Sequence, residues 1–327
     1  MTGSVTDDGH LPGLGEIEDA SRRIEGVASR TPLIESPALS KLTEHEVYLK
    51  LECFQPIKVF KIRGAYNKIS RVPERRVVAA SSGNHGIAVA YSSRMLGKKC
   101  TVVVPETVVR EKIEKIQEYG AEAIRFGKLS GEREAKARQI AGAMESAFIH
   151  PFNDSDIIAG QGTCGLEISQ QLTDFDAVLV PVGGGGLISG ISTALKAERP
   201  GTRIYGVEPA GAPKLTEALK AKRIVSVPPR ASIADGLLPS ALGDLTFRIC
   251  VRNVDGTFTI SEDDILKATR ALYGAAGIIA EPSGAVALAP LLSKASRSIG
   301  RRVVIVVSGG NISRELLARV LSPQNLS

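Results

Sequence analysis

Tryptophan is absent from the 327-residue sequence, and aromatic residues make up only 4% of it. Surfaces that bind nucleic acid usually combine a basic face with aromatic side chains on which bases stack. The net charge of +6 comes from scattered residues, and we interpret the longest basic cluster, Lys214 to Arg223, as one solvated helix face. The composition therefore argues against nucleic acid as a partner.

Cysteine is scarce, and long apolar runs are missing. The four cysteines, Cys53, Cys100, Cys164 and Cys250, lie far apart, with no Cys-x-x-Cys pair among them. This spacing argues against a disulfide framework or a zinc site and fits a reducing cytoplasm. No apolar run approaches the roughly 20 residues that cross a bilayer. With 43% apolar residues, we expect a globular cytoplasmic protein without a membrane partner.

Short apolar runs alternate with helical patterns along the chain. Ala177-Val182 and Arg302-Val307 are nearly continuous apolar stretches, as expected of parallel strands buried on both faces. Val108-Tyr119 has helical periodicity and stops at Gly120, and Ser261 begins a helix with a near capping box. The other expected strands are Glu46-Leu51, Val77-Ala80, Lys99-Val104, Ala123-Phe126 and Arg203-Val207. The alternation predicts an α/β fold with right-handed crossovers.

A four-glycine run, Gly183 to Gly186, follows an apolar strand and precedes an expected helix, Leu187-Lys196. Backbone N–H groups in such a run can converge on an anion, and the helix dipole adds attraction. The run lacks the lysine of a Walker loop and the context of a dinucleotide-binding fold. A phosphate cradle is the favoured interpretation, and a glycine turn that only permits close packing is the alternative.

Two further motifs accompany the glycine run. Lys61 lies in the motif Val59-Phe60-Lys61-Ile62-Arg63-Gly64-Ala65, where it could bind a cofactor aldehyde and Phe60 could pack on a planar ring. Taken alone, Lys61 is more typical of a surface lysine. Ser81-Ser82-Gly83-Asn84-His85-Gly86 precedes a helix expected from Ile87 to Leu96, and it suits a substrate carboxylate or an ordinary helix cap. An amine, a phosphate cradle and a carboxylate loop together predict a pyridoxal-phosphate enzyme.

These motifs resemble the threonine/serine dehydratase and serine racemase family of fold-type II pyridoxal-phosphate enzymes. Further stretches agree in order: Arg30-Thr31-Pro32-Leu33, Ile158-Ala159-Gly160-Gln161-Gly162-Thr163, Gly206-Val207-Glu208-Pro209, Ala234-Asp235-Gly236, Glu281-Pro282-Ser283-Gly284-Ala285 and Ser308-Gly309-Gly310-Asn311. The resemblance implies an α/β fold with two open, twisted, mostly parallel sheets flanked by helices, similar to tryptophan synthase β. It also implies a large cofactor-binding domain of residues 1–66 and 151–327, and a small mobile substrate-binding domain of residues 67–150. A homodimer without a separate regulatory domain is expected.

The resemblance implies roles for single residues. Lys61 would form a Schiff base with the cofactor and act as the base at the substrate Cα, with Phe60 beside the ring. Asn84 would bond the cofactor's 3-hydroxyl, Ser308 would face the pyridine nitrogen, and Ser82 would lie where racemases of the group keep a second base. The phosphate would be held by Gly183, Gly184, Gly185, Gly186 and Leu187. The substrate carboxylate would be held by Ser81, Ser82, Gly83, Asn84 and His85.

The sequence departs from the family's pattern in two places. The family usually reads Thr-Gly-Ser before Phe-Lys, where this chain reads Ile57-Lys58-Val59. Lys58 could point into the cleft and pair with an acidic substrate, or it could point to solvent. Metal-binding relatives carry an acid a few residues after Glu-Pro, where this chain offers Lys214. Glu208, which ends a strand, is therefore only a weak candidate for a metal ligand.

The resemblance implies β-elimination from a hydroxy amino acid, such as L-threonine or L-serine, to a 2-oxo acid and ammonia. The departure at Lys58 favours an unusual or acidic substrate. Three alternatives stay open: an amino-acid racemase that uses Ser82, a β-replacement enzyme, and a cofactor-binding regulator that does not turn over.

Overall fold

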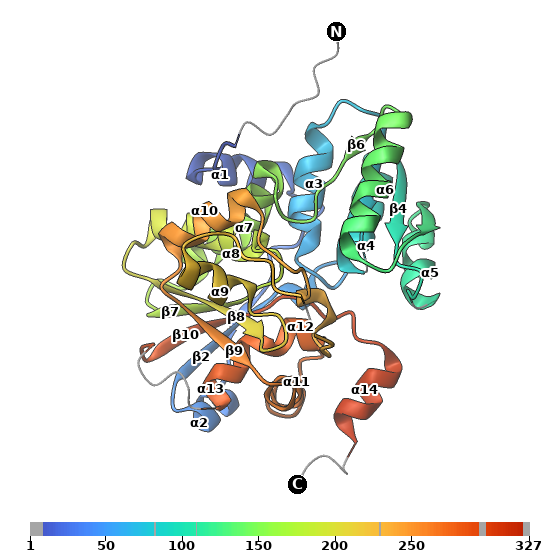
Figure 1. Cartoon of the computed structure of the whole chain (residues 1–327). Helices are drawn as coiled ribbons and strands as arrows, with labels where there is room; N and C mark the ends of the chain where they lie inside the picture. The colour runs from blue at the N-terminus through green and yellow to red at the C-terminus, as the bar shows by residue number, and fades with distance from the viewer. Residues whose placement is uncertain (1–8, 82, 109, 229, 294–298, 323–327) are drawn as a thin grey trace.

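The computed structural model describes residues 9–81, 83–108, 110–228, 230–293 and 299–322, and they form two parts, each built on its own sheet (Figure 1). The strands are β1 (Leu33–Glu35), β2 (Glu46–Leu51), β3 (Arg76–Ala80), β4 (Lys99–Val104), β5 (Glu122–Arg125), β6 (Ala147–Phe148), β7 (Ala177–Pro181), β8 (Arg203–Pro209), β9 (Gly256–Ile260) and β10 (Arg302–Val307). The α-helices are α1 (Leu14–Arg23), α2 (Pro37–Thr43), α3 (Lys61–Arg71), α4 (Asn84–Met95), α5 (Arg110–Glu118), α6 (Ser130–Ala143), α7 (Ser155–Gln171), α8 (Gly186–Glu198), α9 (Lys214–Ala221), α10 (Asp244–Asn253), α11 (Glu262–Ala276), α12 (Pro282–Ala285), α13 (Ala289–Leu292) and α14 (Arg314–Leu321). Short 3₁₀ turns are η1 (Glu52–Phe54), η2 (Asp235–Leu237) and η3 (Val286–Leu288).

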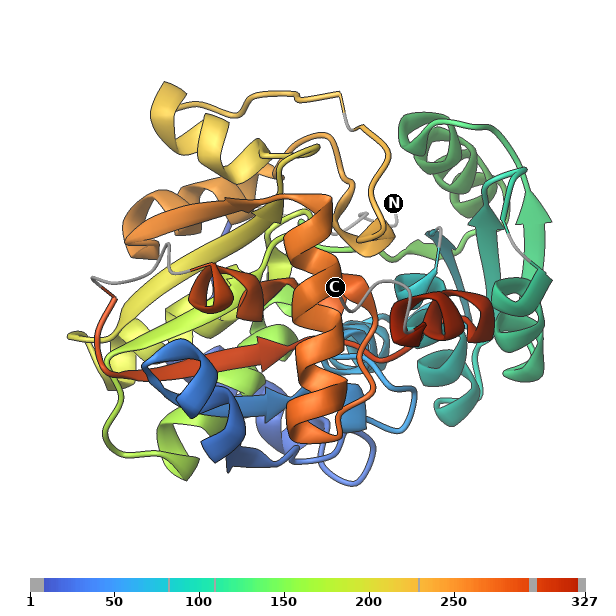
Figure 2. The same ribbon diagram turned by 90° about the horizontal axis from the view of Figure 1, so that it is seen from below.

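The larger part is a six-stranded sheet in the order β1-β2-β10-β7-β8-β9. Only the edge pair β1–β2 is antiparallel. Successive side chains of its central strands face opposite sides: Leu179 and Ile305 pack with residues of α2 and α11, whereas Val180 and Val304 pack with residues of α7 and α8. Helices cover both faces in this way, which is why β7 and β10 read as continuous apolar runs (Figure 2).

The smaller part is a four-stranded parallel sheet in the order β5-β4-β3-β6. Val102 packs with residues of α4 and α5 on one side, and Val103 packs with α6 on the other. Figure 2 shows this sheet beside the larger one. The expected fold class, two mostly parallel sheets flanked by helices, is confirmed.

The expected elements agree closely with the structure where their pattern was strong. β2, β4 and β10 have the expected bounds, and β3, β5, β7 and β8 differ by one or two residues at their ends. Strands β1, β6 and β9 were not predicted from the sequence. Their side chains are mostly not fully buried, so these strands lack a continuous apolar run. Helix α4 begins at Asn84 rather than Ile87, so the polar loop extends into its first turn.

The expectation for the cluster Lys214 to Arg223 was wrong at its first residue. Lys214 is fully buried, whereas Lys220, on the same helix, has 69% of its side chain exposed. Lys214 forms an ion pair with Glu208, and the positions of the two residues in the sequence do not indicate this contact. Among the described residues, no helix is long and apolar enough to cross a membrane.

Candidate active site

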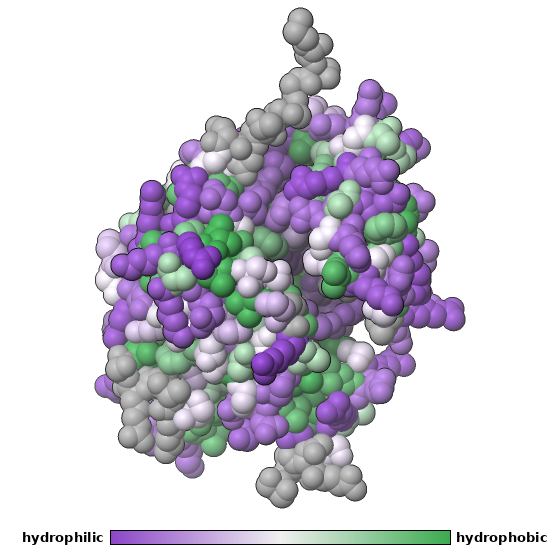
Figure 3. Space-filling view, in the orientation of Figure 1, coloured by the Kyte–Doolittle hydropathy of each residue, from purple (hydrophilic) through white to green (hydrophobic). Residues whose placement is uncertain are grey.

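A cleft of about 750 Å³ lies between the two parts of the molecule, where Figure 3 shows the surface hollowed. Its walls bring together most of the residues that the sequence motifs singled out. They are Phe60, Lys61, Ser81, Gly83, Asn84, His85, Gly183, Gly184, Gly185, Gly186, Leu187 and Ser308. Ser82 lies outside the described residues, and Lys58 does not line the cleft.

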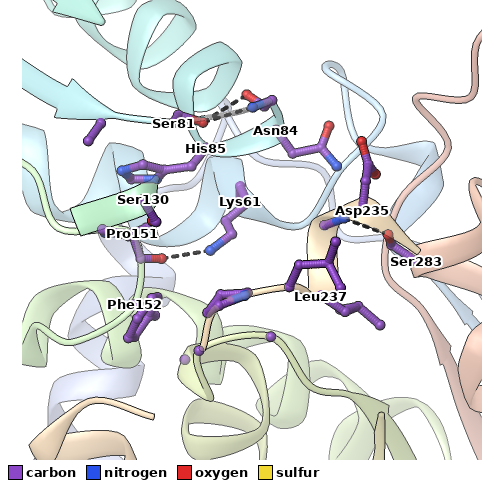
Figure 4. A pocket seen from close by; sticks show the side chains of 18 of the residues that line it. Lys61, Ser81, Asn84, His85, Ser130, Pro151, Phe152, Asp235, Leu237 and Ser283 are labelled. Atoms are coloured by element: carbon purple, nitrogen blue, oxygen red, sulfur yellow. Dashed lines mark hydrogen bonds between the residues drawn. The ribbon is translucent and has the colours of Figure 1, made fainter. Parts of the chain in front are cut away.

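Lys61 is the first residue of α3 and projects into the cleft (Figure 4). Its Nζ donates a hydrogen bond of 2.6 Å to the carbonyl oxygen of Pro151. Desolvation lowers the pKa of Lys61 from 10.5 to about 8. A shift of this size raises the neutral, nucleophilic fraction at pH 7 by about 300-fold. The amine is therefore suited to attack an aldehyde and to accept a proton afterwards.

A buried ion-pair network holds the first turn of α3. Arg63, two residues after Lys61, donates to Glu52 at 2.7 Å and to Glu167 at 2.7 Å. Lys50 donates to Glu167 at 2.5 Å, so two cations offset two carboxylates. Although burial opposes it, the charge of Arg63 helps to lower the pKa of Glu52 to about 2. This network is the role of Arg63 in the lysine motif: it fixes the helix that presents the amine.

The glycine run turns from β7 into α8 and admits no side chain at its centre. Gly185 has a φ of +94°, and a Cβ there would lie 2.8 Å from Thr246. A Cβ on Gly184 would lie 2.2 Å from the ring of Phe152. Because the first N–H groups of a helix have no acceptor within it, those at the start of α8 are available to an anion. The run therefore packs closely against Phe152 and Thr246, and it offers the backbone donors that a phosphate group requires.

The polar loop leads into the start of α4, where a second set of backbone N–H groups begins a helix. The hydroxyl of Ser81 accepts hydrogen bonds from the N–H groups of Gly83 (3.0 Å) and Gly86 (2.8 Å), which fixes the loop. The N–H groups of Asn84 and His85 lie in the first helical turn and have no acceptor within the helix. A substrate carboxylate is the natural ligand for such donors.

The two histidines of the cleft are neutral. His85 Nε2 donates to the carbonyl oxygen of Ile149 at 3.0 Å, and desolvation lowers its pKa to about 3. His150 Nδ1 accepts from the N–H groups of Phe152 and Asn153, and desolvation lowers its pKa to about 4. The imidazole of His85 therefore positions the segment that follows β6 rather than supplying charge to a substrate.

Asn84 belongs to a polar network at the far side of the cleft. Its amide donates to the buried Glu281 at 2.6 Å and accepts from Asn311 at 2.9 Å. Desolvation and the charge of Asp235 raise the pKa of Glu281 to about 7. In the sequence Glu281 belongs to a motif without an assigned role, because nothing in the chain order places it beside Asn84.

Lys58 departs from its expected role. Its side chain is exposed, and its φ of +59° is a left-handed conformation that glycine adopts without strain. The backbone conformation at this position therefore explains why the family usually carries glycine there. Its N–H donates to Gln55 and its carbonyl accepts from Gly310, so the residue serves the backbone of the loop, and contact with a substrate in the cleft is not supported.

The structure also adds charged residues to the cleft that no motif indicated. Arg133 on α6 lines it with only 8% of its surface exposed, and Lys112 on α5 pairs with Asp235 across it at 2.6 Å. In the sequence, Arg133 is one of several basic residues in α6, and only the structure shows that it is buried. The cleft thus contains two cations on the side of the smaller sheet, Lys112, which is paired with Asp235, and Arg133.

The predicted cofactor fits these residues. The glycine run lines the cleft at the start of α8, Lys61 presents an amine with a lowered pKa, and Ser308 lines the same cleft. Lys61 lines the same cleft as the glycine run and the polar loop, and Figure 4 shows its amine on the same side of the cleft as Pro151.

Comparison with known proteins agrees with this geometry. The L-threonine ammonia-lyase of Thermotoga maritima is 41% identical over 313 residues, which cover 94% of this chain and 78% of that protein. The L-threo-3-hydroxyaspartate ammonia-lyase of Saccharomyces cerevisiae is 35% identical over 316 residues, which cover 95% and 97%. The solved structure of maize serine racemase superposes with a TM-score of 0.91 at 34% identity, covering 95% of this chain and 97% of that one.

The family profile described as "Pyridoxal-phosphate dependent enzyme" matches residues 24–309. That match spans the lysine motif, the polar loop and the glycine run, which are the parts of the chain that form the cleft. The chain therefore belongs to the pyridoxal-phosphate dependent enzyme family, and its cofactor is pyridoxal phosphate.

Proposed function

We propose that this protein is an ammonia-lyase that converts a β-hydroxy-α-amino acid to a 2-oxo acid and ammonia. One observation carries the proposal: the amine of Lys61, with a pKa lowered to about 8, shares one cleft with two helix starts, one with donors for a phosphate and one with donors for a carboxylate. Relatives named as ammonia-lyases cover most of the chain at 35–41% identity and support the same reaction.

The residues of the chain divide the work. The glycine run holds the cofactor phosphate, and the start of α4 holds the substrate α-carboxylate. When bound, pyridoxal phosphate draws electrons from the substrate Cα and makes its proton acidic. Lys61 removes that proton and passes it to the β-hydroxyl, which leaves as water. Water is then taken up again when the eliminated product hydrolyses to the 2-oxo acid and ammonia.

An assay of three products tests this function. The protein with its cofactor is incubated with L-serine, L-threonine or L-threo-3-hydroxyaspartate, and the 2-oxo acid, ammonia and D-isomer are measured. We expect equal amounts of 2-oxo acid and ammonia. A D-isomer without 2-oxo acid would instead identify a racemase, for which Ser82 stays the predicted second base. No product from any substrate would favour a regulator, and β-replacement would need an added nucleophile.

We further propose that the substrate carries a second acidic group. Arg133 is almost fully buried at the cleft wall, and the described residues offer its guanidinium one hydrogen-bond acceptor, the carbonyl of Lys128 at 3.0 Å. Desolvation lowers the pKa of Arg133, and among the residues that the structure describes the charge of Glu132 opposes this effect. A guanidinium can donate five hydrogen bonds, so most of its donors are left for a ligand such as the β-carboxylate of 3-hydroxyaspartate.

Arg133→Leu is expected to lower kcat/KM for L-threo-3-hydroxyaspartate by about 10²-fold, since a hydrogen-bonded charge pair in such a site contributes about 2–5 kcal/mol. The value for L-threonine should change much less. Steady-state kinetics of both substrates measure the ratio. Arg110→Leu is the matched control, because Arg110 has 87% of its side chain exposed. An equal loss on both substrates would contradict this role of Arg133.

We propose a homodimer that covers an apolar patch on the larger part. Phe54, Tyr273 and Ile279 are 53%, 44% and 47% exposed. A Cβ on Gly310 would lie 3.0 Å from the carbonyl oxygen of Ile279 and 3.2 Å from Cβ of Cys53, so the segments that carry Ile279 and Phe54 are neighbours. Exposed aromatic and apolar side chains of this kind commonly form the centre of subunit interfaces.

Sedimentation equilibrium is expected to give twice the chain mass of 34.6 kDa. Phe54→Asp should shift the mass toward one chain, because it places a charge at the centre of the patch. Met95→Asp is the control, since Met95 is 51% exposed but lies at the end of α4 in the smaller part. A monomeric wild type would refute the dimer.

The division into a large domain of residues 1–66 and 151–327 and a small mobile domain of residues 67–150 remains a proposal. It is supported by polar contacts across the cleft, such as Lys115 with Asn311 at 3.1 Å, which can break and reform at little cost. A cytoplasmic location is proposed as well, since all four cysteines are free and buried.

A further inference from the structure

Lys214 is one of the largest fully buried side chains of the protein, and its ammonium group is surrounded by oxygen atoms. Nζ donates to the carbonyl oxygens of Val182 (3.0 Å), Ala212 (3.0 Å) and Leu237 (2.9 Å). Oε1 of Glu208, which is also fully buried, lies 3.2 Å away. Three carbonyls and one carboxylate thus enclose one positive charge.

The charged form of Lys214 is required by this geometry. Each carbonyl oxygen can only accept a hydrogen bond, and three of them around one nitrogen use three N–H groups, which only an ammonium provides. Burial lowers the pKa of Lys214, and the nearby carboxylate of Glu208 opposes that effect. Glu208 itself accepts from the N–H groups of Leu215 (2.8 Å) and Thr216 (2.9 Å), so it is fixed at the start of α9.

The three carbonyls belong to segments that meet behind the cofactor site. Val182 directly precedes the glycine run. Leu237 follows Gly236, and both of these residues line the cleft, as Lys61 does. Ala212 begins the turn into α9. Neither Lys214 nor Glu208 lines the cleft, so the ammonium acts from behind the wall on the backbone that shapes it.

We propose that Lys214 is a tethered cation that positions the glycine run against the Gly236–Leu237 wall, and that its ammonium does the work of a bound monovalent metal ion. Carbonyl oxygens held close together repel one another, and a cation between them offsets that repulsion. Because the cation is part of the chain, cofactor binding in the wild type does not depend on added cations. The inference concerns the cofactor site alone and does not rest on the proposed substrate or reaction.

Lys214→Ala tests the proposal, because it leaves the four oxygen atoms facing a space without a charge. The affinity for pyridoxal phosphate is measured by the absorbance of the bound cofactor, at constant ionic strength, in tetramethylammonium, potassium or ammonium chloride. In tetramethylammonium, which is too large for the space, we expect the affinity of the variant to fall by about tenfold or more. Potassium or ammonium should restore most of it, and the wild type should bind equally in all three salts.

Two matched variants complete the experiment. Lys220→Ala removes an exposed lysine from the same helix and should show no cation dependence. Lys214→Ala/Glu208→Gln removes the carboxylate as well, so potassium and ammonium should no longer restore its binding. Unfolding of the cofactor-free proteins in the three salts gives a second readout: potassium or ammonium should raise the unfolding midpoint of Lys214→Ala alone.

Three results would overturn the proposal. One is unchanged cofactor affinity in Lys214→Ala. Another is a loss that no small cation restores, including failure to obtain folded variant protein in any of the salts. The third is an equal cation response in Lys214→Ala and Lys214→Ala/Glu208→Gln, because the cation would then bind elsewhere.

Discussion

Lys61→Ala is expected to abolish covalent retention of pyridoxal phosphate and to lower kcat by about 10²–10⁴-fold, the range for loss of a positioned general base. The physical reason is that one group performs two tasks: its amine binds the cofactor aldehyde, and it accepts the proton from the substrate Cα. The lowered pKa of Lys61, about 8, makes both tasks feasible near neutral pH. Borohydride, which reduces a C=N bond to a stable amine, should attach the cofactor permanently to Lys61 in the wild type.

Peptide mass spectrometry after reduction locates the attached group. Lys58→Gly is the control: Lys58 lies three residues before Lys61 but is exposed, and glycine suits its φ of +59°. This variant should be labelled at Lys61 as the wild type is. A label on Lys58 in the wild type, or full cofactor retention in Lys61→Ala, would show that another amine binds the cofactor.

Gly184→Asp is expected to weaken the binding of pyridoxal phosphate by about 10²-fold or more. Its carboxylate repels the phosphate, and loss of two charge-assisted hydrogen bonds at about 1.5 kcal/mol each amounts to about 3 kcal/mol. The new Cβ also displaces the ring of Phe152, which lies 2.2 Å from its position. Titration of the cofactor-free protein with pyridoxal phosphate measures the change.

Two companion variants separate charge from space at this site. Gly184→Ala adds the steric conflict with Phe152 without a charge, so it should weaken binding less than Gly184→Asp. Gly201→Asp adds the same charge where a Cβ would meet no atom within 4 Å, so it should leave binding unchanged. We expect Gly184→Asp to stay folded, which circular dichroism checks. Unchanged affinity in a folded Gly184→Asp would place the phosphate elsewhere.

Two buried groups near the site make the stability of the protein depend on pH in opposite directions. The pKa of His85 is lowered to about 3. Its contribution to the free energy of unfolding is therefore present above the unfolded pKa of 6.5 and is lost as pH falls toward 3. The pKa of Glu281 is raised to about 7. Its contribution to the free energy of unfolding is therefore present below the unfolded pKa of 4.5 and is lost as pH rises through 7. Both shifts arise mainly from desolvation at the cleft.

Sequence by itself determined the parts of this protein that depend on local chemistry. The apolar runs that became β4, β7 and β10 are buried on both faces in any parallel sheet, so their composition alone predicts them. The glycine run and the polar loop each follow a strand and open a helix, and an anion site of this kind is formed by consecutive backbone N–H groups. Lys61 was predictable with them, because its neighbours and these two loops form a known combination.

Only the tertiary structure decided which distant side chains share a site. Asn84 and Glu281 are 197 positions apart, and Lys112 and Asp235 are 123 apart, yet each pair is 2.6 Å apart in the cleft. Arg133 became a candidate ligand of the substrate because α6 turns it into that cleft, where desolvation leaves its charge in need of a partner.

Two lysines show the same limit most clearly. Lys58, adjacent to the lysine motif, is exposed and does not line the cleft, and its backbone adopts a left-handed conformation. Lys214, which reads as part of a solvated basic helix, is buried among four oxygen atoms, those of Glu208 and Ala212 from the preceding strand and turn and those of Val182 and Leu237 from distant parts of the chain. Burial and charge pairing are properties of the packed chain, since they depend on segments that are distant in sequence and meet only in the folded protein.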